Sequence, residues 1–359
     1  MTGPTAVTSV QSGSTWHCCT TIHGISAQES IIASTEFVHP QLAPLFTSAV
    51  AAHATVLADD LGLFEKLAKE RIKESDLEKD PWSAQRVRIA GVLQALCRAG
   101  AVEYRDFSYE LTELGSDLHQ QAPIFKLWFG AYASVLADAV AGVPDTVTLV
   151  RGAVVAESSS RVGAQYLDET LLDLVASLAP QGPICDLGCG TGSRLLAMCT
   201  RAEQPGIGFD ISGTAVDAAQ NTVRDARVLG VELEIQQADV TMLTGSRPEV
   251  DIVTQAFMTH HIAPDDHCAD VLRSYRVRFP RARYLVVFDT VSPSAASASS
   301  PELFAPGFDY IHALRGMEPR TREAARRVFA EAGYHCLREV TLAVPNSYAW
   351  VLRPDGRSA

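Results

Sequence analysis

Residues 185–192 read Cys-Asp-Leu-Gly-Cys-Gly-Thr-Gly, an acidic residue followed by Gly-x-Gly-x-Gly. A short apolar run precedes this stretch, and a helical pattern that begins at Ser193 follows it. Glycines permit backbone dihedrals that a Cβ forbids, and they let the chain approach a ligand at a helix N-terminus. The stretch therefore predicts a strand–turn–helix unit that binds a nucleotide-type ligand.

Carboxylates stand at the ends of the next two expected strands. Residues 206–211 predict an apolar strand that ends at Asp210, about 20 residues after the turn, where such folds place an acid on ribose hydroxyls. Residues 231–240 alternate as a strand and reach Asp239. Because three consecutive strands end in an acid or a glycine, we expect one ligand crevice at this edge of the sheet.

With these residues the chain resembles the class I S-adenosylmethionine (SAM)-dependent methyltransferases. The resemblance implies that the turn holds the methionine end of SAM, Asp210 binds the ribose and Asp239 faces the adenine. The cofactor-binding residues expected in this way are Asp186, Gly188, Cys189, Gly190, Gly192, Asp210, Ile211, Asp239, Val240 and Gln255. A nicotinamide dinucleotide site is the competing interpretation, but its Gly-x-Gly-x-x-Gly fingerprint requires a glycine where Ser193 stands.

Length and charge narrow the range of partners. A chain of 359 residues with 47% hydrophobic content is long enough for two domains. The net charge of −12 and the lack of a basic run argue against a nucleic-acid partner, because binding to phosphates needs clustered basic side chains. The N-terminus lacks the features of a secretory signal, and we see no apolar run of membrane-spanning length. We expect a cytoplasmic enzyme that acts on small molecules, away from membranes.

Periodicity divides the chain into four parts. Residues 1–38 predict a flexible arm, residues 39–120 a winged-helix-like domain, residues 121–170 connector helices that roof the active site, and residues 171–359 the SAM-binding domain. The expected fold is therefore α/β, a Rossmann-like methyltransferase sheet with a mainly helical N-terminal domain. Paired strands after residue 336 predict that the sheet ends in an antiparallel hairpin.

The N-terminal pattern of helices followed by a hairpin is that of a winged helix. A DNA-binding role is disfavoured, because the second helix offers Arg86 and Arg88 and then mainly apolar residues. Joined to a methyl-donor domain, this part resembles the dimerisation domain of small-molecule O-methyltransferases and their C-methylating relatives. The resemblance implies a homodimer.

In the connector, Arg161 is a candidate for binding a substrate carboxylate. A guanidinium can bind a carboxylate through two parallel hydrogen bonds. A solvated arginine at the start of a helix explains the same residue equally well. Trp128 is a second candidate for the pocket wall, although packing in the core accounts for it too.

Paired histidines follow another expected strand, at 251–257. Because ligands bind at the carboxyl ends of strands in an open α/β sheet, His260 and His261 should lie beside the methyl donor. In the O-methyltransferases a His-Asp pair follows this strand, and its histidine is the general base. By that resemblance His260 would be the base, but His261 replaces the aspartate that would orient it.

A third histidine, His312, stands on an expected helix that faces the same crevice. Histidines from separate segments suit a divalent metal with open coordination positions, although hydrogen-bonded pocket histidines are the simpler interpretation. The arrangement resembles the metal-dependent α-keto acid C-methyltransferases of antibiotic biosynthesis. The resemblance implies that iron or zinc is bound by His260, His261 and His312, with His261 either a third ligand or the base.

The leading hypothesis is SAM-dependent methylation of the β-carbon of an α-keto acid in secondary metabolism. A cation chelated by the keto acid would stabilise the enolate, and Arg161 would anchor the carboxylate. The expected catalytic residues are His260, His261 and Arg161. A small-molecule O-methyltransferase with His260 as general base is the first alternative, and a non-catalytic donor-binding regulator is the second.

Overall fold

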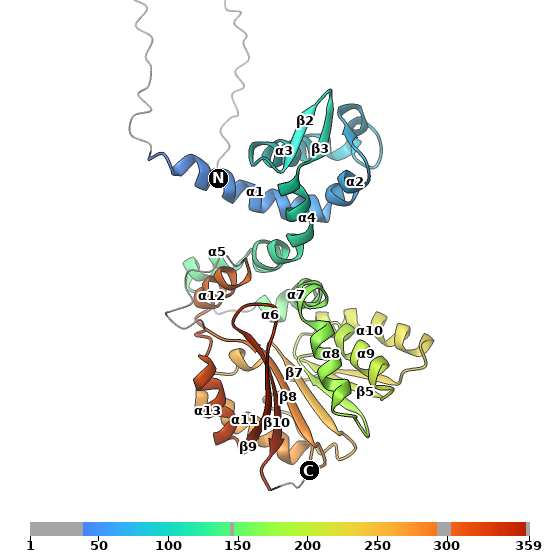
Figure 1. Cartoon of the computed structure of the whole chain (residues 1–359), viewed down its shortest axis with the longest axis vertical. Coiled ribbons are helices and arrows are strands. Elements are labelled where there is room, and N and C mark those ends of the chain that lie inside the picture. Colours follow the sequence, from blue (N-terminus) through green and yellow to red (C-terminus); the bar gives the residue numbers. More distant parts are fainter. Residues whose placement is uncertain (1–38, 144–146, 293–302, 357–359) are drawn as a thin grey trace, which may run out of the picture. The chain divides into compact units, whose positions relative to one another are not determined.

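A seven-stranded sheet organises the C-terminal half of the chain (Figure 1). The structure is a computed structural model, and it describes residues 39–143, 147–292 and 303–356. The arm expected at 1–38 lies outside the described residues. Contacts group Pro44–Ala359 as one compact unit, and the boundaries expected at residues 120 and 170 remain predictions.

The strand order of this sheet is β6-β5-β4-β7-β8-β10-β9. The five strands from β4 to β8 run parallel, and β10 pairs antiparallel with both β8 and β9. The strands are β4 Ile184–Leu187, β5 Gly206–Asp210, β6 Leu233–Gln237, β7 Ile252–Ala256, β8 Tyr284–Thr290, β9 Tyr334–Thr341 and β10 Ser347–Pro354. The expected parallel sheet with a terminal antiparallel hairpin is therefore present.

Helices cover both faces of the sheet (Figure 1). On one side lie α8 (Asp168–Ser177), α9 (Ser193–Ala202) and α10 (Gly213–Val228), and on the other lie α11 (Asp265–Arg278) and α13 (Arg322–Glu331). Every residue of β4 and β7 is buried, as expected of central parallel strands with both faces covered.

The topology determines where a ligand can bind. From β4 the chain moves outward to β5 and β6, and it then returns to place β7 on the other side of β4. The connections after β4 and β7 therefore diverge, which opens a crevice at the carboxyl ends of these two strands. The glycine turn follows β4 and the paired histidines follow β7, so both motifs lie at this crevice.

The N-terminal part combines helices with a small sheet. Its helical elements are α1 (Leu42–Asp60), α2 (Leu63–Lys69), η2 (Glu74–Glu78), η3 (Ser83–Gln85), α3 (Arg86–Arg98) and α4 (Glu113–Phe125). The three strands, in the order β1-β3-β2, are β1 (Ile72–Lys73), β3 (Ser108–Leu111) and β2 (Val102–Arg105). A helix, a second helix and a hairpin thus follow one another in the order that the periodicity predicts.

The connector is more broken than the sequence suggests. The expected connector helices are interrupted: a π-helical turn, Lys126–Ala131, follows α4, and α5 (Val135–Ala141) begins only after a further turn. Turns of this kind recur at functional sites because the extra residue redirects side chains. Here it brings Trp128 and Tyr132 to the wall of one cavity. The connector continues as α6 (Val147–Val150) and α7 (Gly152–Tyr166).

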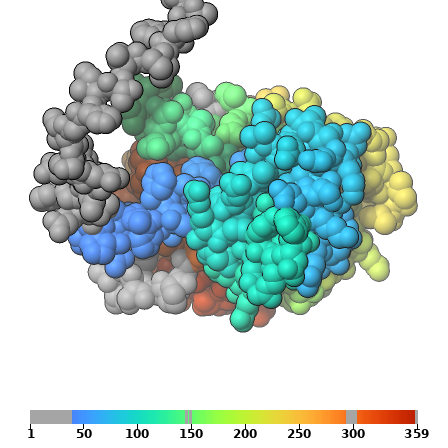
Figure 2. Space-filling view, turned by 90° about the horizontal axis from the view of Figure 1, so that it is seen from above, coloured from blue at the N-terminus to red at the C-terminus, as the bar shows by residue number. Residues whose placement is uncertain are grey.

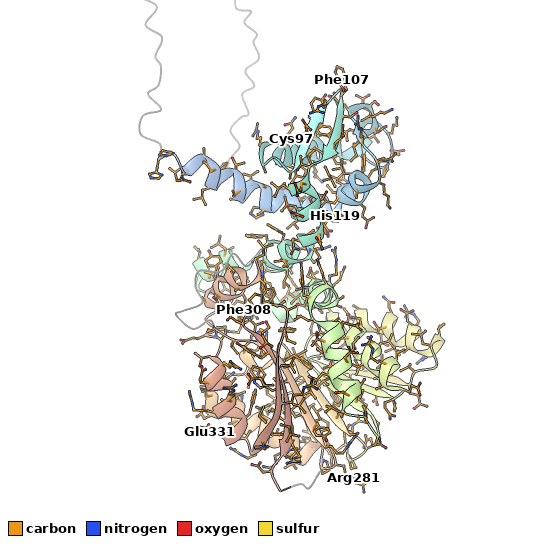
Figure 3. All side chains as sticks on the ribbon, in the orientation of Figure 1. Cys97, Phe107, His119, Arg281, Phe308 and Glu331 are labelled. Atoms are coloured by element: carbon orange, nitrogen blue, oxygen red, sulfur yellow. The ribbon has the colours of Figure 1, made fainter. Side chains whose placement is uncertain are left out.

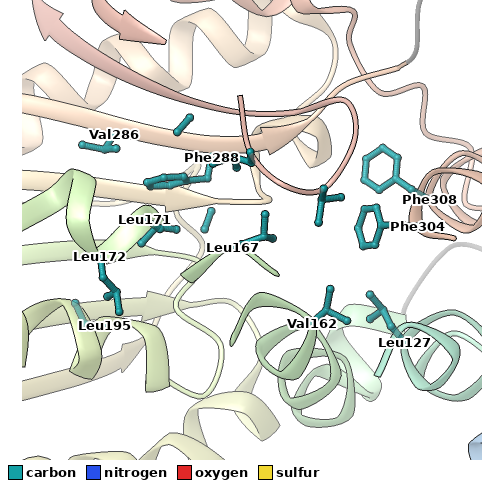
Figure 4. Close-up of a cluster of buried hydrophobic side chains, with 14 of the residues drawn as sticks. Leu127, Val162, Leu167, Leu171, Leu172, Leu195, Val286, Phe288, Phe304 and Phe308 are labelled. Atoms are coloured by element: carbon teal, nitrogen blue, oxygen red, sulfur yellow. The ribbon is translucent and has the colours of Figure 1, made fainter. Parts of the chain in front are cut away.

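One apolar cluster links the sheet to the connector (Figure 4). Leu171 and Leu195 from α8 and α9 pack with Phe288 of β8, and the cluster continues through Val162 to Phe304 of α12 (Phe304–Leu314). Burial of large apolar side chains is the main force that stabilises such packing. The connector and α12 are therefore held against the sheet edge where the ligand crevice opens.

Two helical stretches are long and apolar enough to cross a membrane. They are Leu42–Asp60 and Glu113–Ala141, and one third of each apolar window is buried. Length and composition alone do not separate a membrane helix from an apolar helix that packs inside a protein or against a partner. The expectation that the protein has no membrane partner therefore remains a prediction.

We predict that Glu339→Gln lowers stability at neutral pH and that this loss shrinks in acid. Burial opposes ionisation of Glu339, but hydrogen bonds from Arg326, Arg322 and Trp350 outweigh it and lower its pKa below 4.5. A lowered folded-state pKa stabilises the fold above the unfolded-state pKa, and this contribution disappears as pH falls through the folded value. Chemical unfolding should show a difference of about 1–2 kcal/mol at pH 7.

The matched control is Glu331→Gln, which changes an exposed glutamate of α13. It should leave the free energy of unfolding nearly unchanged from pH 3 to pH 7. A Glu339→Gln loss that stayed constant or grew in acid would contradict the assignment.

Candidate active site

A cavity of about 450 Å³ opens at the carboxyl edge of the sheet. The turn after β4, the ends of β5 and β7, the connector helices and α12 all contribute to its wall. The two sequence motifs, the glycine turn and the paired histidines, therefore share one space.

Left-handed backbone shapes the glycine turn. Gly188, Gly190 and Gly192 have φ values of 79°, 56° and 73°, which residues with a Cβ rarely adopt. Asp210, at the end of β5, fixes the turn because its carboxylate accepts a hydrogen bond from the Gly190 amide at 2.8 Å. The backbone thus presents the turn to the cavity, and the helix α9 begins directly behind it.

Seven of the ten expected cofactor-binding residues line the cavity. They are Gly188, Cys189, Gly190, Asp210, Ile211, Asp239 and Val240. Burial raises the pKa of Asp210, against the hydrogen bonds from the Ser212 and Gly190 amides. Asp239 accepts hydrogen bonds from the amide and hydroxyl of Thr241 at 2.9 and 2.7 Å. Both carboxylates are therefore held in place by neighbouring backbone.

The other three expected residues do not line the cavity. Asp186 lies beneath the turn, where it accepts a hydrogen bond from the Thr254 hydroxyl at 2.7 Å, and burial raises its pKa to about 6. A Cβ at Gly192 would point at Ile235. Gln255 pairs in register with Leu187, whose side chain packs with α11, so Gln255 is buried on that face. The side chains of Asp186 and Gln255 therefore support the turn and the core, and direct contact of these three residues with the cofactor remains a prediction.

His260, His261 and His312 come together in the wall of the same cavity. One ring nitrogen of each lies within 4.8 Å of those of the other two. The first two stand on a 3₁₀ turn, η5 (Thr259–His261), and the third stands on α12. The cluster therefore unites two segments that are about fifty residues apart in the sequence.

Two of these rings have fixed orientations. The Nδ1 of His260 lies 2.5 Å from Asp289 Oδ1, and the Nδ1 of His312 lies 2.7 Å from the carbonyl oxygen of Phe308. The Nε2 of His312 is buried and has no hydrogen-bond partner among the described residues. A carboxylate or carbonyl on one ring nitrogen leaves the other available as a ligand, as in many metal sites.

Burial and neighbouring charge keep two imidazoles neutral. Burial, with the nearby His260 and Arg315, lowers the pKa of His312 to about 3 and that of His261 well below 6.5. The pKa of Asp289 is also lowered, because His260 and hydrogen bonds from Thr259 outweigh the effect of burial. Neutral rings beside an ionised carboxylate are what a metal site requires.

Aromatic side chains enclose the space beside the histidines. Trp128 contacts Tyr132 and Phe304 with ring centroids 5.8 and 5.1 Å apart, and Phe308 packs on His312 at 4.2 Å. Phe308 is labelled on α12 in Figure 3. A Cβ at Gly307 would lie 2.3 Å from the Trp128 ring, so only glycine lets the indole sit there. This half of the cavity fits a flat apolar group.

Arg161 does not reach this cavity. Its guanidinium forms two hydrogen bonds with Asp59, at 2.6 and 3.0 Å, and it is not among the lining residues. The structure therefore pairs Arg161 with Asp59 and does not bring it to the cavity, and its expected carboxylate-binding role remains a prediction. Arg315 of the turn after α12 does line the cavity, with its guanidinium 5.2 Å from the centre of the Tyr132 ring.

Sequence reasoning missed Asp289 and Arg315. A weak signal existed for both. Asp289 ends the strand that neighbours β7, and Arg315 follows His312 at helical spacing. Neither signal identifies a site residue until the structure shows which segments lie next to the histidines.

The family of the chain follows from its relatives. A family model described as a methyltransferase domain matches residues 184–278. The indolepyruvate C-methyltransferase of Streptomyces griseus is 61% identical over 323 residues, which cover 90% of this chain and 98% of that protein. The chain belongs to the SAM-dependent methyltransferase family.

Solved structures show the same fold at low identity. The mitomycin 7-O-methyltransferase is 16% identical with a TM-score of 0.58, over 88% of this chain and 97% of that one. A methyltransferase of calicheamicin biosynthesis, bound to S-adenosylhomocysteine, is 18% identical with a TM-score of 0.58, over 87% and 97%. The methyltransferase described here therefore has the class I α/β fold with a helical N-terminal region.

We predict that Gly190→Ala weakens SAM binding about tenfold or more. The left-handed φ disfavours alanine by about 1–2 kcal/mol, and a Cβ would lie 3.0 Å from Ala156 on α7, so the turn must shift. Calorimetric titration with SAM measures the effect. Gly230→Ala is the control, because its φ is 75° but no atom lies within 4 Å of the added Cβ. Equal SAM affinity of the two variants would contradict the assigned role of the turn.

Proposed function

We propose that this methyltransferase transfers the methyl group of SAM to the β-carbon of an aromatic α-keto acid, as a step of secondary metabolism. The observation that carries the proposal is the cluster of His260, His261 and His312 beside an aromatic wall, in the same cavity as the glycine turn. The relative at 61% identity is named for indolepyruvate, an aromatic α-keto acid.

The three histidines fit a divalent metal. Imidazole nitrogens are ligands of both iron and zinc, and the cluster leaves room for substrate oxygens. The buried Nε2 of His312 has no protein partner among the described residues, and Asp289 orients the His260 ring. A bound cation would supply Lewis acidity, which makes the β-C–H of a chelated α-keto acid more acidic.

The chain's own residues hold and orient the reactants in this proposal. The glycine turn and Asp210 place SAM at one end, while Trp128 and Phe308 hold the side chain of the acceptor at the other. The β-carbon of the acceptor, the methyl group and the sulfur of SAM are then aligned. This alignment lowers the activation barrier to methyl transfer, because the reactants are already held in a reactive geometry. The aromatic wall also excludes water, which strengthens electrostatic interactions.

His261 serves as a third ligand in this proposal. Burial and the charges around it lower its pKa well below 6.5, whereas a general base works best with a pKa near the working pH. Its Nδ1 faces the sulfur of Met317 at 3.3 Å, so its Nε2 is the nitrogen available to a cation.

The O-methyltransferase alternative is disfavoured. His260 with Asp289 has the form of a general base and its orienting carboxylate. However, a base toward one hydroxyl needs no second and third imidazole within 4.8 Å, and the relative at 61% identity is a C-methyltransferase by name.

We propose a cytoplasmic homodimer built through the N-terminal part. Leu45 and Phe46 of α1 are 66% and 73% exposed, and Phe107 at the tip of the β2–β3 hairpin is 76% exposed (Figure 3). Figure 2 shows α1, in blue, open at the surface. Apolar patches of this kind are typical of protein interfaces, and a second copy would cover the faces that by composition alone resemble membrane spans.

Metal removal should abolish turnover without abolishing SAM binding. We expect chelator-treated protein and His312→Asn to lose methyl transfer by about 100-fold or more, because Lewis acidity contributes several kcal/mol. Deuterium exchange at the β-carbon of indolepyruvate should fall in parallel. Full turnover after metal removal, or transfer of a labelled methyl to oxygen, would contradict the proposal.

Arg315→Gln should raise the KM for the keto acid about 10- to 100-fold and leave the KM for SAM unchanged. Arg315 lines the acceptor end of the cavity, and a charged hydrogen bond to a carboxylate is worth about 1.5–3 kcal/mol. Arg161→Gln is the matched control, and it should cost stability through loss of the Asp59 pair. If Arg161→Gln raised the KM for the keto acid and Arg315→Gln did not, Arg161 would be the carboxylate-binding residue instead.

A further inference from the structure

A short segment links the two parts of the chain that carry the histidines. Residues 317–320, named here the brace, lie between α12 and α13. At its start the Met317 amide donates to the carbonyl oxygen of His312 at 2.9 Å, and the Met317 sulfur lies 3.3 Å from the Nδ1 of His261. The brace therefore contacts both histidine segments.

Arg320, at the end of the brace, holds the turn that carries His260 and His261. Its Nη1 donates to the carbonyl oxygen of Thr259 at 2.6 Å, and its Nη2 donates to the carbonyl oxygen of Ile262. These two carbonyls flank the histidine pair. Its Nε donates to Asp265 at 2.6 Å, and its side chain is only 9% exposed.

The brace is itself fixed to the strand that supports His260. Ser292, just beyond β8, donates from its amide to the Arg320 carbonyl at 2.9 Å and from its hydroxyl to the Pro319 carbonyl at 2.7 Å. Asp289 at the end of β8 accepts hydrogen bonds from the His260 ring and amide. The end of β8 thus holds the histidine pair directly through Asp289 and indirectly through Arg320.

A three-residue 3₁₀ turn needs such support. It makes few internal hydrogen bonds, so contacts to the carbonyls at its two ends help to fix its geometry. A planar guanidinium can bond two carbonyls and a carboxylate at once with a fixed geometry, which an ammonium cannot reproduce. Arg320 lies outside the main cavity, in the wall of a much smaller one that it shares with His260 and Asp289, and its hydrogen bonds reach the histidine pair through the backbone of this turn.

We propose that Arg320 is a positioning residue that sets the imidazoles of His260 and His261 against His312. The proposal rests on the function proposed above. It goes beyond that function by assigning the geometry of the cluster to a guanidinium whose hydrogen bonds go to Asp265 and to the carbonyls of Thr259 and Ile262.

The test is Co²⁺ titration of the full-length protein after metal removal, with Arg320→Gln and Arg320→Lys. Partners of metal ligands typically contribute 10- to 100-fold to metal affinity, so we expect a loss of about that size in Arg320→Gln, with an altered visible spectrum. Arg320→Lys should retain more Co²⁺ affinity than Arg320→Gln, although less than the wild type. In turnover, kcat should fall while the KM for SAM stays constant.

Arg283→Gln is the matched control, because Arg283 also forms a fork, with Asp251 and the carbonyl oxygen of Ala179, at the other end of the sheet. It should lower thermal stability and leave Co²⁺ affinity unchanged. If Arg320→Gln behaved in the same way, the proposal would be overturned.

Histidine side-chain NMR of the metal-free protein gives a reading that is independent of metal. Arg320→Gln should shift the imidazole signals of His260 and His261, and Arg283→Gln should not. Failure of the wild type to bind Co²⁺ would contradict the metal proposal alone. Unshifted imidazole signals in Arg320→Gln would contradict the role of Arg320, whether or not the wild type binds Co²⁺.

Discussion

The hydrogen bond between His260 and Asp289 is the contact on which the acceptor half of the site depends. It exists because β7 and β8 are parallel neighbours, with Ala256 in register with Phe288. That register brings the residue after Phe288 beside the turn that follows β7. With its Nδ1 bonded to Asp289, the His260 ring has its Nε2 left to face the other two imidazoles.

The two halves of the cavity differ in how they are built. At the donor end, backbone and short acidic side chains form the wall, because a glycine turn brings the main chain close to the ligand. At the acceptor end, the wall consists of imidazoles from η5 and α12 and of aromatic rings from the connector and α12. The wall around the glycine turn is therefore built by the sheet and its turns, whereas the aromatic part of the wall comes from the connector and α12.

Local features were predictable from the sequence, and long-range ones were not. The glycine turn and the strands around it could be read because their conformation depends on neighbouring residues. The pairing of Arg161 with Asp59 could not be foreseen, because Asp59 lies 102 positions earlier in the chain. The burial of Gln255 could not be foreseen, because the sequence does not show which face of β7 each residue occupies or what covers that face. Asp289 was missed because only the sheet register brings it to His260.

The most direct measurement is a metal-edge anomalous diffraction map of the purified protein with S-adenosylhomocysteine bound. We expect one peak about 2.0–2.2 Å from the Nε2 atoms of His260, His261 and His312, on the side of the cluster that faces the S-adenosylhomocysteine sulfur. A map with the imidazoles ordered and no peak among them, in protein that turns over the keto acid, would contradict it.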